Sequence, residues 1–186
     1  MNKKELYNCL ESCPIVASVH DISFENVLKS PAEVIFLLGG NILTVGDRIE
    51  AAHKAGKSIF IHIDLTDGIG KDRSGVQYLA SIGADGILST KAILIRIAKE
   101  CGLLTVQRFF AYDTQGIESI SEILANSSPD IVEIMPGVIG KIIERFSKNE
   151  VPLIAGGLIE TKLEVTTALS LGALAVSTGV EDLWYI

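Results

Sequence analysis

Short apolar runs alternate with longer amphipathic segments along most of this chain. Each run is bounded by Gly, Pro, Asp or Asn and is typical of a buried strand, whereas the segments between runs repeat apolar residues at helical spacing. The runs predict strands at residues 15–19, 34–38, 59–64, 86–88, 103–107, 131–135, 153–155 and 174–177. Regular alternation of strands and helices predicts an all-parallel sheet, and eight repeats predict that the sheet closes on itself.

The expected architecture is therefore a compact α/β fold, a (β/α)8 TIM-like barrel formed by residues 1–186 as a single domain. The chain is short for this fold, which typically takes about 250 residues, so its helices and loops have to be short. Residues 1–12 predict an additional short helix that closes the N-terminal end of the barrel, and residues 181–186 predict a very short final helix.

Composition and charge narrow the function classes. A formal net charge of −7 and a pI near 5.0 argue against broad electrostatic attraction of nucleic acid or of an anionic membrane. No apolar run is long enough to span a bilayer and the first residues lack a signal-peptide core, so we expect a cytoplasmic protein without a membrane partner. The three cysteines are odd in number, which favours reduced thiols over a set of disulfides. The three histidines lack the paired spacing of metal ligands, so no metal site is predicted.

Strand parity indicates which polar side chains point into the barrel. In the run from Ile59 to Asp64 the three isoleucines share one face, which suits the helix layer, so the alternate residues are expected inside. The inward-facing polar residues predicted in this way are His62, Asp64, Thr105, Gln107 and Glu133, with Arg108 at the start of the following loop. Because a barrel interior is normally apolar, polar groups there point to a binding site.

Two glycine-containing loops follow the last two predicted strands. The first is Gly156-Gly157, and the second is Ser177-Thr178-Gly179. Loops after the seventh and eighth strands of such barrels commonly bind phosphate through backbone N–H groups, and glycine allows the phosphate to approach those groups. These five residues are therefore the predicted phosphate site. The alternative interpretation of Gly156-Gly157 is a tight turn only.

Other residues of the predicted mouth come from the ends of the fourth, sixth and third strands. Lys91 is expected in a first helical turn, where a bound anion would offset its conflict with the helix dipole, although a solvated lysine fits the sequence equally well. Gly137 ends a tight turn at a helix start, and residues 67–70 predict a mobile loop over the mouth.

An enzymatic interpretation rests on the two inward carboxylates. Asp64 and Glu133 could act as general acid and base, with Lys91 stabilising negative charge. No lysine lies inside a predicted strand, which argues against a Schiff-base aldolase. Structural ion pairs with Lys91 or Arg108 would also explain the two carboxylates, and His62 would then be an interior histidine with satisfied hydrogen bonds.

Motifs along the chain resemble the glycerol-3-phosphate-responsive antiterminator family. They are His62-Ile63-Asp64-Leu65 with Gly68, Asp85-Gly86-Ile87-Leu88-Ser89-Thr90-Lys91, Leu103-Leu104-Thr105-Val106-Gln107-Arg108-Phe109-Phe110 with Asp113, Pro129-Asp130-Ile131-Val132-Glu133-Ile134-Met135-Pro136-Gly137, Ile154-Ala155-Gly156-Gly157-Leu158-Ile159, and Val176-Ser177-Thr178 with Leu183-Trp184. The resemblance covers residues 36–184 in the expected order. Each motif alone is weak, and the set is specific.

The resemblance implies a barrel regulator that binds glycerol 3-phosphate and acts on the leader mRNA of glycerol-utilisation genes, so that polymerase reads past a terminator. It implies no cofactor besides this effector. The phosphate would rest on Gly156, Gly157, Ser177 and Thr178. Some of Asp64, Lys91, Gln107, Arg108 and Glu133 would contact the glycerol hydroxyls. The family commonly has Ser after Ser-Thr at the last strand, whereas this chain has Gly179, which removes one hydroxyl contact.

The RNA-binding residues are the least defined part of this prediction. Lys141, Arg145 and Lys148 are spaced to share one helix face, which is the best basic candidate, but such spacing also fits a solvated face. Aromatic residues, which stack on single-stranded bases, make up 6% of the chain. The runner-up is a small phosphosugar isomerase or lyase that uses Asp64 and Glu133. The sequence is compatible with a monomer or a homo-oligomer.

Overall fold

Eight parallel strands form a closed barrel in chain order, and β8 pairs with β1. The computed structural model describes residues 1–20 and 24–186. The strands are β1 (Ile15–Val19), β2 (Val34–Leu37), β3 (Ser58–His62), β4 (Gly86–Ser89), β5 (Leu104–Phe110), β6 (Ile131–Met135), β7 (Leu153–Gly156) and β8 (Ala175–Thr178). The predicted (β/α)8 barrel is confirmed, with all eight strands at their expected places in the sequence.

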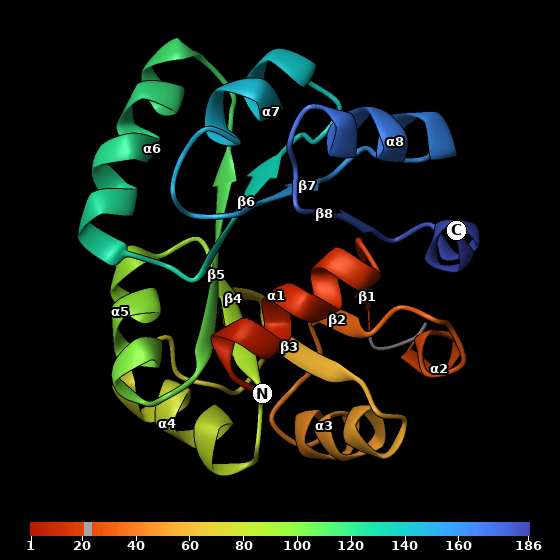
Figure 1. Ribbon diagram of the computed structural model, residues 1–186. Coiled ribbons are helices and arrows are strands. Elements are labelled where there is room, and N and C mark those ends of the chain that lie inside the picture. Colours follow the sequence, from red (N-terminus) through yellow and green to blue (C-terminus); the bar gives the residue numbers. More distant parts are fainter. Residues whose placement is uncertain (21–23) are drawn as a thin grey trace.

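Helices surround the strands, and one helix crosses the end of the barrel (Figure 1). They are α1 (Lys3–Ser12), α2 (Phe24–Val27), α3 (Val45–Lys54), α4 (Arg73–Ser81), α5 (Ala92–Glu100), α6 (Thr114–Ser127), α7 (Gly140–Phe146) and α8 (Lys162–Ser170), with 3-10 turns η2 (Ile63–Leu65) and η3 (Glu181–Tyr185). The short final helix is thus a 3-10 turn, which lies beside α2 near the C-terminus (Figure 1). Among the described helices, none has the length and apolarity needed to cross a membrane.

The N-terminal helix closes the barrel as predicted. Asn2 and Glu5 form a capping box at the start of α1. The side chains of Leu6 and Leu10 are fully buried in the interior cluster, which also contains Phe36 and Phe60 in an edge-to-face contact at 5.8 Å. Burial of each leucine contributes about 2 kcal/mol to stability. The N-terminal half of the barrel interior is therefore a packed apolar core.

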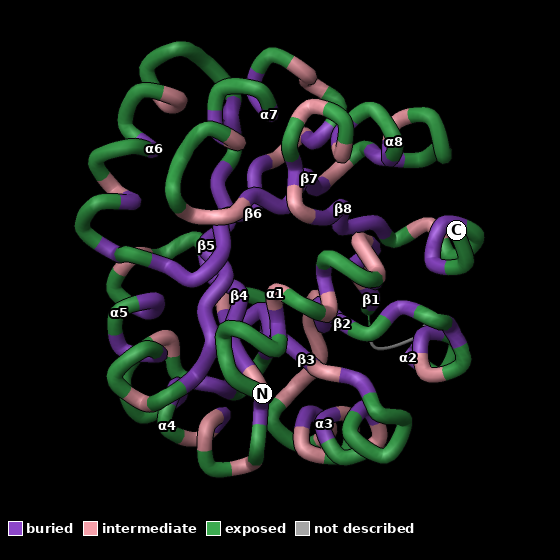
Figure 2. The backbone as a smooth tube through the Cα atoms, in the orientation of Figure 1, coloured by how far each residue is buried: buried purple, intermediate pink, exposed green. Residues whose placement is uncertain are grey.

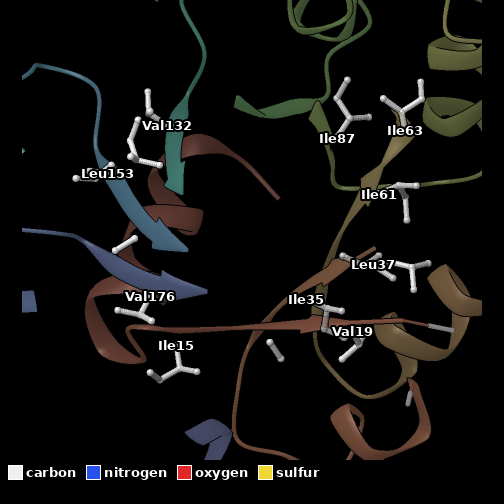
Figure 3. Packing of buried hydrophobic residues seen from close by; sticks show 14 of the residues in the cluster. Ile15, Val19, Ile35, Leu37, Ile61, Ile63, Ile87, Val132, Leu153 and Val176 are labelled. Carbon is white, nitrogen blue, oxygen red and sulfur yellow. The ribbon is translucent and has the colours of Figure 1, made fainter. Parts of the chain in front are cut away.

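A second apolar layer lies between the strands and the helices (Figure 3). It contains the alternate strand residues, such as Ile15, Ile35, Ile61, Val132 and Val176. Because the strands are covered on both faces, they are buried almost throughout, whereas the outer sides of the helices are exposed (Figure 2).

Most strand ends differ by a few residues from the sequence prediction, and the differences in β3 and β5 change the position of charged site residues. β3 stops at His62, and Asp64 lies in the 3-10 turn η2 rather than in the strand. β5 continues to Phe110, so Arg108 lies inside the strand and not in the following loop. Arg108 therefore has a fixed strand orientation, and the orientation of Asp64 is set by a turn.

The predicted inward orientation of Thr105 and Gln107 is wrong. Alternate residues Leu104 and Val106 belong to the interior cluster, so Thr105 and Gln107 face the helix layer. Thr105 Oγ1 donates to Asp130 Oδ2 at 2.8 Å, and Gln107 Oε1 accepts from Ser127 Oγ at 2.5 Å. Asp130 lies in the loop before β6 and Ser127 is the last residue of α6, and these partners explain why two polar side chains are tolerated behind the sheet.

Candidate functional site

A buried polar network lies inside the upper barrel, formed by Arg108 of β5, Glu133 of β6 and Ser177 of β8. Arg108 Nε donates to Glu133 Oε2 at 2.5 Å, and Ser177 Oγ donates to Glu133 Oε1 at 2.5 Å. The exposed fractions are 6% for Arg108, 0% for Glu133 and 3% for Ser177. Both oxygens of the carboxylate are therefore engaged, and the charge of Glu133 is matched by the guanidinium.

Gly156 gives this network its space. A Cβ atom at Gly156 would lie 2.5 Å from Ser177 Oγ and 2.6 Å from Glu133 Oε1. Gly137 packs against the same loop. Its N–H donates to the carbonyls of Gly156 at 2.5 Å and Gly157 at 3.0 Å. A Cβ at Gly137 would meet the Gly156 nitrogen at 2.8 Å. Gly137 and Gly156 are therefore packing glycines that support the site.

A cavity of about 270 Å³ opens at the C-terminal mouth of the barrel, next to this network. It is lined by Ser18, His20, Leu38, Arg108, Met135, Gly157, Leu158, Ile159, Glu160, Ser177, Thr178, Gly179 and Val180. Five residues predicted from the sequence are brought together here, namely Arg108, Gly157, Ser177, Thr178 and Gly179. The cavity is large enough for a small phosphorylated ligand and has an apolar side formed by Leu38 and Ile159.

Three residues that line the cavity have backbone N–H groups without a carbonyl partner in the described part of the chain. Gly157 has a φ of +76°, which places it in the region that favours glycine. Within residues 1–20 and 24–186, the N–H groups of Gly157, Leu158 and Gly179 donate to no backbone carbonyl. They belong to the two loops in which the sequence places a phosphate.

Thr178 orders these loops through its side chain. Its Oγ1 donates to the Ile159 carbonyl at 2.9 Å and accepts from the Val180 N–H at 3.1 Å. The Thr178 carbonyl in turn accepts from Trp184 Nε1 at 2.9 Å. Because Thr178 Oγ1 is engaged in both directions, Thr178 ties the β7 and β8 loops together rather than offering a free hydroxyl to a ligand.

Ser18 and His20 are wall residues that the sequence analysis missed. Ser18 shares the inward face of β1 with Val16, and its Oγ is buried without a hydrogen-bond partner among the described residues. Strand parity along residues 15–19 was a usable signal, since Ser18 is the only polar residue of that strand. A buried hydroxyl without a partner at a cavity wall is suited to a ligand hydroxyl or phosphate oxygen.

His62 is buried on the inward face of β3, as predicted, but it does not line the cavity. Burial, assisted by the charge of Arg108, lowers the pKa of His62 to about 4. Its Nδ1 lies 4.0 Å from Asp64 Oδ2 and has no hydrogen-bond partner within the described residues. His62 is therefore a neutral group at physiological pH, placed between the cavity network and Asp64.

Asp64 and Lys91 form a separate cluster above β3 and β4. Asp64 Oδ2 accepts from Ser89 Oγ at 3.0 Å and from the Thr90 N–H at 2.7 Å. Lys91 is the N-cap residue of α5 rather than a first-turn residue, and its Nζ lies 4.0 Å from Asp64 Oδ1. Neither side chain lines the cavity of the β7 and β8 loops. The predicted ligand-contact residues thus fall into two groups.

The loop after β3 is tied to its neighbour instead of standing free over the mouth. The Asp67 N–H donates to the Gly40 carbonyl at 3.0 Å, and the Ile42 N–H donates to the Asp67 carbonyl at 2.9 Å. Lys71 Nζ donates to the carbonyls of Ile63 and Thr66. These bonds connect the segment to the loop after β2 and to η2, and the mobility of residues 67–70 stays a prediction.

The predicted basic face is shorter than expected. Lys141 and Arg145 are exposed on α7, but the helix ends at Phe146, so Lys148 lies outside it. The Arg145 guanidinium lies over the Phe146 ring, 5.9 Å from its centroid. Among the described residues, no group of three or more His, Cys, Asp or Glu side chains could hold a metal ion.

Fold and cavity together define a small (β/α)8 barrel with a pocket at the carboxyl ends of its strands. Residues 15–184 match the family model described as glycerol-3-phosphate responsive antiterminator. The chain belongs to this family, so the family predicted from the motifs is confirmed. The description of the family model is that of a regulatory antiterminator.

Relatives support the assignment along most of the chain. The uncharacterized protein YgcP of Escherichia coli strain K12 is 34% identical over 182 residues, which cover 96% of this chain and 95% of that protein. The crystal structure of a glycerol uptake operon antiterminator regulatory protein from Listeria monocytogenes strain 4b F2365 aligns with a TM-score of 0.87 at 30% identity, over 91% of this chain and 94% of that chain.

Two further solved structures are similar to this chain, one in sequence and fold and the other in fold only. A glycerol uptake operon antiterminator-related protein from Thermotoga maritima MSB8 aligns with a TM-score of 0.82 at 30% identity, over 91% of this chain and 96% of that chain. Deoxyribose phosphate aldolase from Aeropyrum pernix aligns with a TM-score of 0.69 at 13% identity, over 98% of this chain and 96% of that chain. The likeness to the aldolase is one of fold alone.

Proposed function

We propose that the protein binds glycerol 3-phosphate in the mouth cavity and, in response, promotes transcription antitermination on the leader mRNA of glycerol-utilisation genes. The effector is a small phosphorylated ligand, and no cofactor is part of the proposal. The observation that carries ligand binding is the way Arg108 is held. Its Nε is bonded to Glu133, and its terminal nitrogens have no hydrogen-bond partner among the described residues, while Arg108 itself lines the cavity.

This arrangement suits a phosphate ester. Glu133 fixes the guanidinium in place and leaves the terminal nitrogens free to bind phosphate oxygens in a fork geometry. The N–H groups of Gly157 and Gly179 would bind the remaining oxygens. Because Arg108 is already ordered by its ion pair, little side-chain entropy is lost when a phosphate binds.

The glycerol part of the ligand has polar and apolar partners in the same cavity. Ser18 Oγ is buried and unpaired within the described residues, and Glu160 also lines the cavity. Both are suited to hydroxyl groups. Leu38 and Ile159 would contact the carbon chain. Ser18 and Glu160 are therefore the proposed hydroxyl contacts, in place of Gln107, which faces the helix layer.

The isomerase or lyase alternative has less support. The two carboxylates that it needs are both engaged, Glu133 by Arg108 and Ser177, and Asp64 by Ser89 and Thr90. A carboxylate locked in an ion pair inside the barrel is poorly placed to exchange protons with a substrate. The family description also favours regulation.

Calorimetric titration with glycerol 3-phosphate tests the ligand, with glycerol and inorganic phosphate as controls. We expect the phosphoester to bind much more tightly than either control. Arg108→Gln should weaken binding at least tenfold, because a charge-assisted hydrogen bond contributes roughly 1.5–3 kcal/mol. Lys91→Gln is the matched control, since Lys91 lies outside the cavity, and it should bind like the wild type. Equal binding of all three compounds would overturn the proposal.

The output is tested by transcription in vitro through a leader terminator of glycerol-utilisation genes from the source organism. Read-through should rise only when the protein and glycerol 3-phosphate are both present. If the ligand binds but read-through does not change, the proposal of glycerol 3-phosphate binding is kept and the proposal of antitermination is wrong.

A further inference from the structure

Two aromatic rings are stacked on the protein surface at the end of β5. The ring centroids of Phe110 and Tyr112 are 5.4 Å apart, and their planes differ by 6°. Phe110 is 39% exposed and Tyr112 is 80% exposed. With so much of its surface in water, the Tyr112 ring keeps one face open for a further planar group.

The backbone on both sides of the ring pair is fixed. Between the two rings, the Ala111 N–H donates to the Met135 carbonyl at 2.8 Å. After them, Asp113 caps α6 and accepts from the Gly116 N–H at 2.7 Å. The pair is therefore held on an extension of the β5–β6 ladder and on a helix start, which lowers the entropy lost when another group stacks on it.

The ring pair is also connected to the ligand cavity. Arg108 and Phe110 are alternate residues of β5, so both lie on its inward face, with Phe110 nearer the mouth. Met135, whose carbonyl holds the Phe110–Tyr112 segment, lines the cavity as well. A ligand that contacts Arg108 therefore contacts the strand that carries Phe110.

The two strands that neighbour β5 are each followed by a segment with an exposed lysine. In the barrel β5 lies between β4 and β6, and the loops that follow parallel strands emerge at the same end. The segments after β4 and β6 carry the exposed residues Lys91 and Lys141. An aromatic surface with an exposed lysine in each neighbouring segment is suited to nucleotides, because bases stack on aromatic rings and phosphates bind cations.

We propose that Phe110 and Tyr112 form a stacking platform for a base of single-stranded RNA, with Lys91 and Lys141 contacting the flanking phosphates. This inference rests on the proposed function, because antitermination supplies RNA as the partner. It centres the contact on the mouth of the barrel, where the start of α7 contributes Lys141, instead of on Arg145 and Lys148. A net charge of −7 limits RNA contact to a short segment, which a local platform satisfies.

The test measures binding of the leader RNA by fluorescence anisotropy, with saturating glycerol 3-phosphate and without it. Tyr112→Ala should weaken RNA binding about tenfold or more, since base–aromatic stacking has an effect of this size. Tyr112→Phe keeps the ring and should bind like the wild type. Tyr185→Ala is the matched control, because Tyr185 is also exposed, at 59%, and should change nothing.

The two proposals fail in different ways. If the wild type and Tyr112→Ala bind RNA equally, the platform is wrong and the proposed function stands. If the wild type binds glycerol 3-phosphate but no RNA, direct RNA contact and the platform are both overturned. Calorimetry with glycerol 3-phosphate should give the same affinity for Tyr112→Ala and wild type, and a loss of ligand binding would show that Tyr112 serves the cavity instead.

Discussion

Arg108 and Glu133 are register partners on neighbouring strands, and they form an ion pair inside the barrel with Nε 2.5 Å from Oε2. The register of β5 and β6 places the guanidinium of Arg108 beside the carboxylate of Glu133. Both groups are buried, so water does not replace either partner. The pair holds Arg108 at the cavity wall. Any change to Glu133 therefore acts on stability and on the cavity together.

Glu133→Gln should destabilise the protein by about 3 kcal/mol, because it leaves the Arg108 guanidinium buried without a counter-charge. Urea unfolding measures the effect. Glu122→Gln, on the exposed side of α6, is the control and should change stability by less than about 0.5 kcal/mol. Equal stability of the two variants would mean that the ion pair contributes nothing to the folded state.

Ser18→Ala should separate binding from stability. The Ser18 hydroxyl is buried without a partner in the described part of the chain, so its removal should leave the unfolding free energy unchanged or slightly raised. Affinity for glycerol 3-phosphate should fall about fivefold, since one neutral hydrogen bond to the ligand, roughly 1 kcal/mol, is lost. Unchanged affinity in calorimetry would exclude Ser18 from the ligand contacts.

Gly156→Ala should destabilise the fold by roughly 1–3 kcal/mol, because the new methyl group would overlap Ser177 Oγ and Glu133 Oε1. Gly46→Ala in α3 provides the opposite control. No atom lies within 4 Å of a Cβ at Gly46, so helix propensity should make this variant about 0.5 kcal/mol more stable. Thermal unfolding distinguishes the two, and a stable Gly156→Ala variant would refute the close packing of the network.

Stability should decrease as the pH falls from about 6.5 towards 4. Burial lowers the pKa of His62 to about 4 in the folded protein, so in this interval the unfolded chain binds a proton that the folded chain does not. Proton binding by the unfolded state favours unfolding, with a limit of about 3 kcal/mol for this shift. Urea unfolding at pH 7.5, 6 and 5 measures the slope. His62→Gln should flatten it, and an unchanged slope would assign the pH dependence to other groups.

Much of the fold was predictable from local pattern. Apolar runs and helical repeats depend on neighbouring residues only, and they identified the eight strands and the helix over the barrel end. Glu133 was predicted to point inward because Val132 and Ile134 have to face the helices. The family was predictable for a related reason, since its motifs are contiguous runs of residues.

The parity of β5 could not be read in the same way. One face of this strand carries Leu104 and Val106, and the other carries Thr105 and Gln107. Either face could point into the barrel until the hydrogen-bond partners of the polar side chains are known. Thr105 faces outward because it bonds to Asp130, and Gln107 does so because it bonds to Ser127. Both partners are distant in the sequence, so the local pattern does not reveal them.

The closed barrel, the family and the glycine loops at the mouth followed from the sequence, because each depends on periodicity or on short contiguous motifs. The three-dimensional contacts were needed to place Ser18 with Arg108 at one cavity and to bond Asp64 to Ser89 and Thr90 in another cluster. A buried polar group is oriented by whichever distant strand or loop offers it a hydrogen bond, and strand register sets those partners.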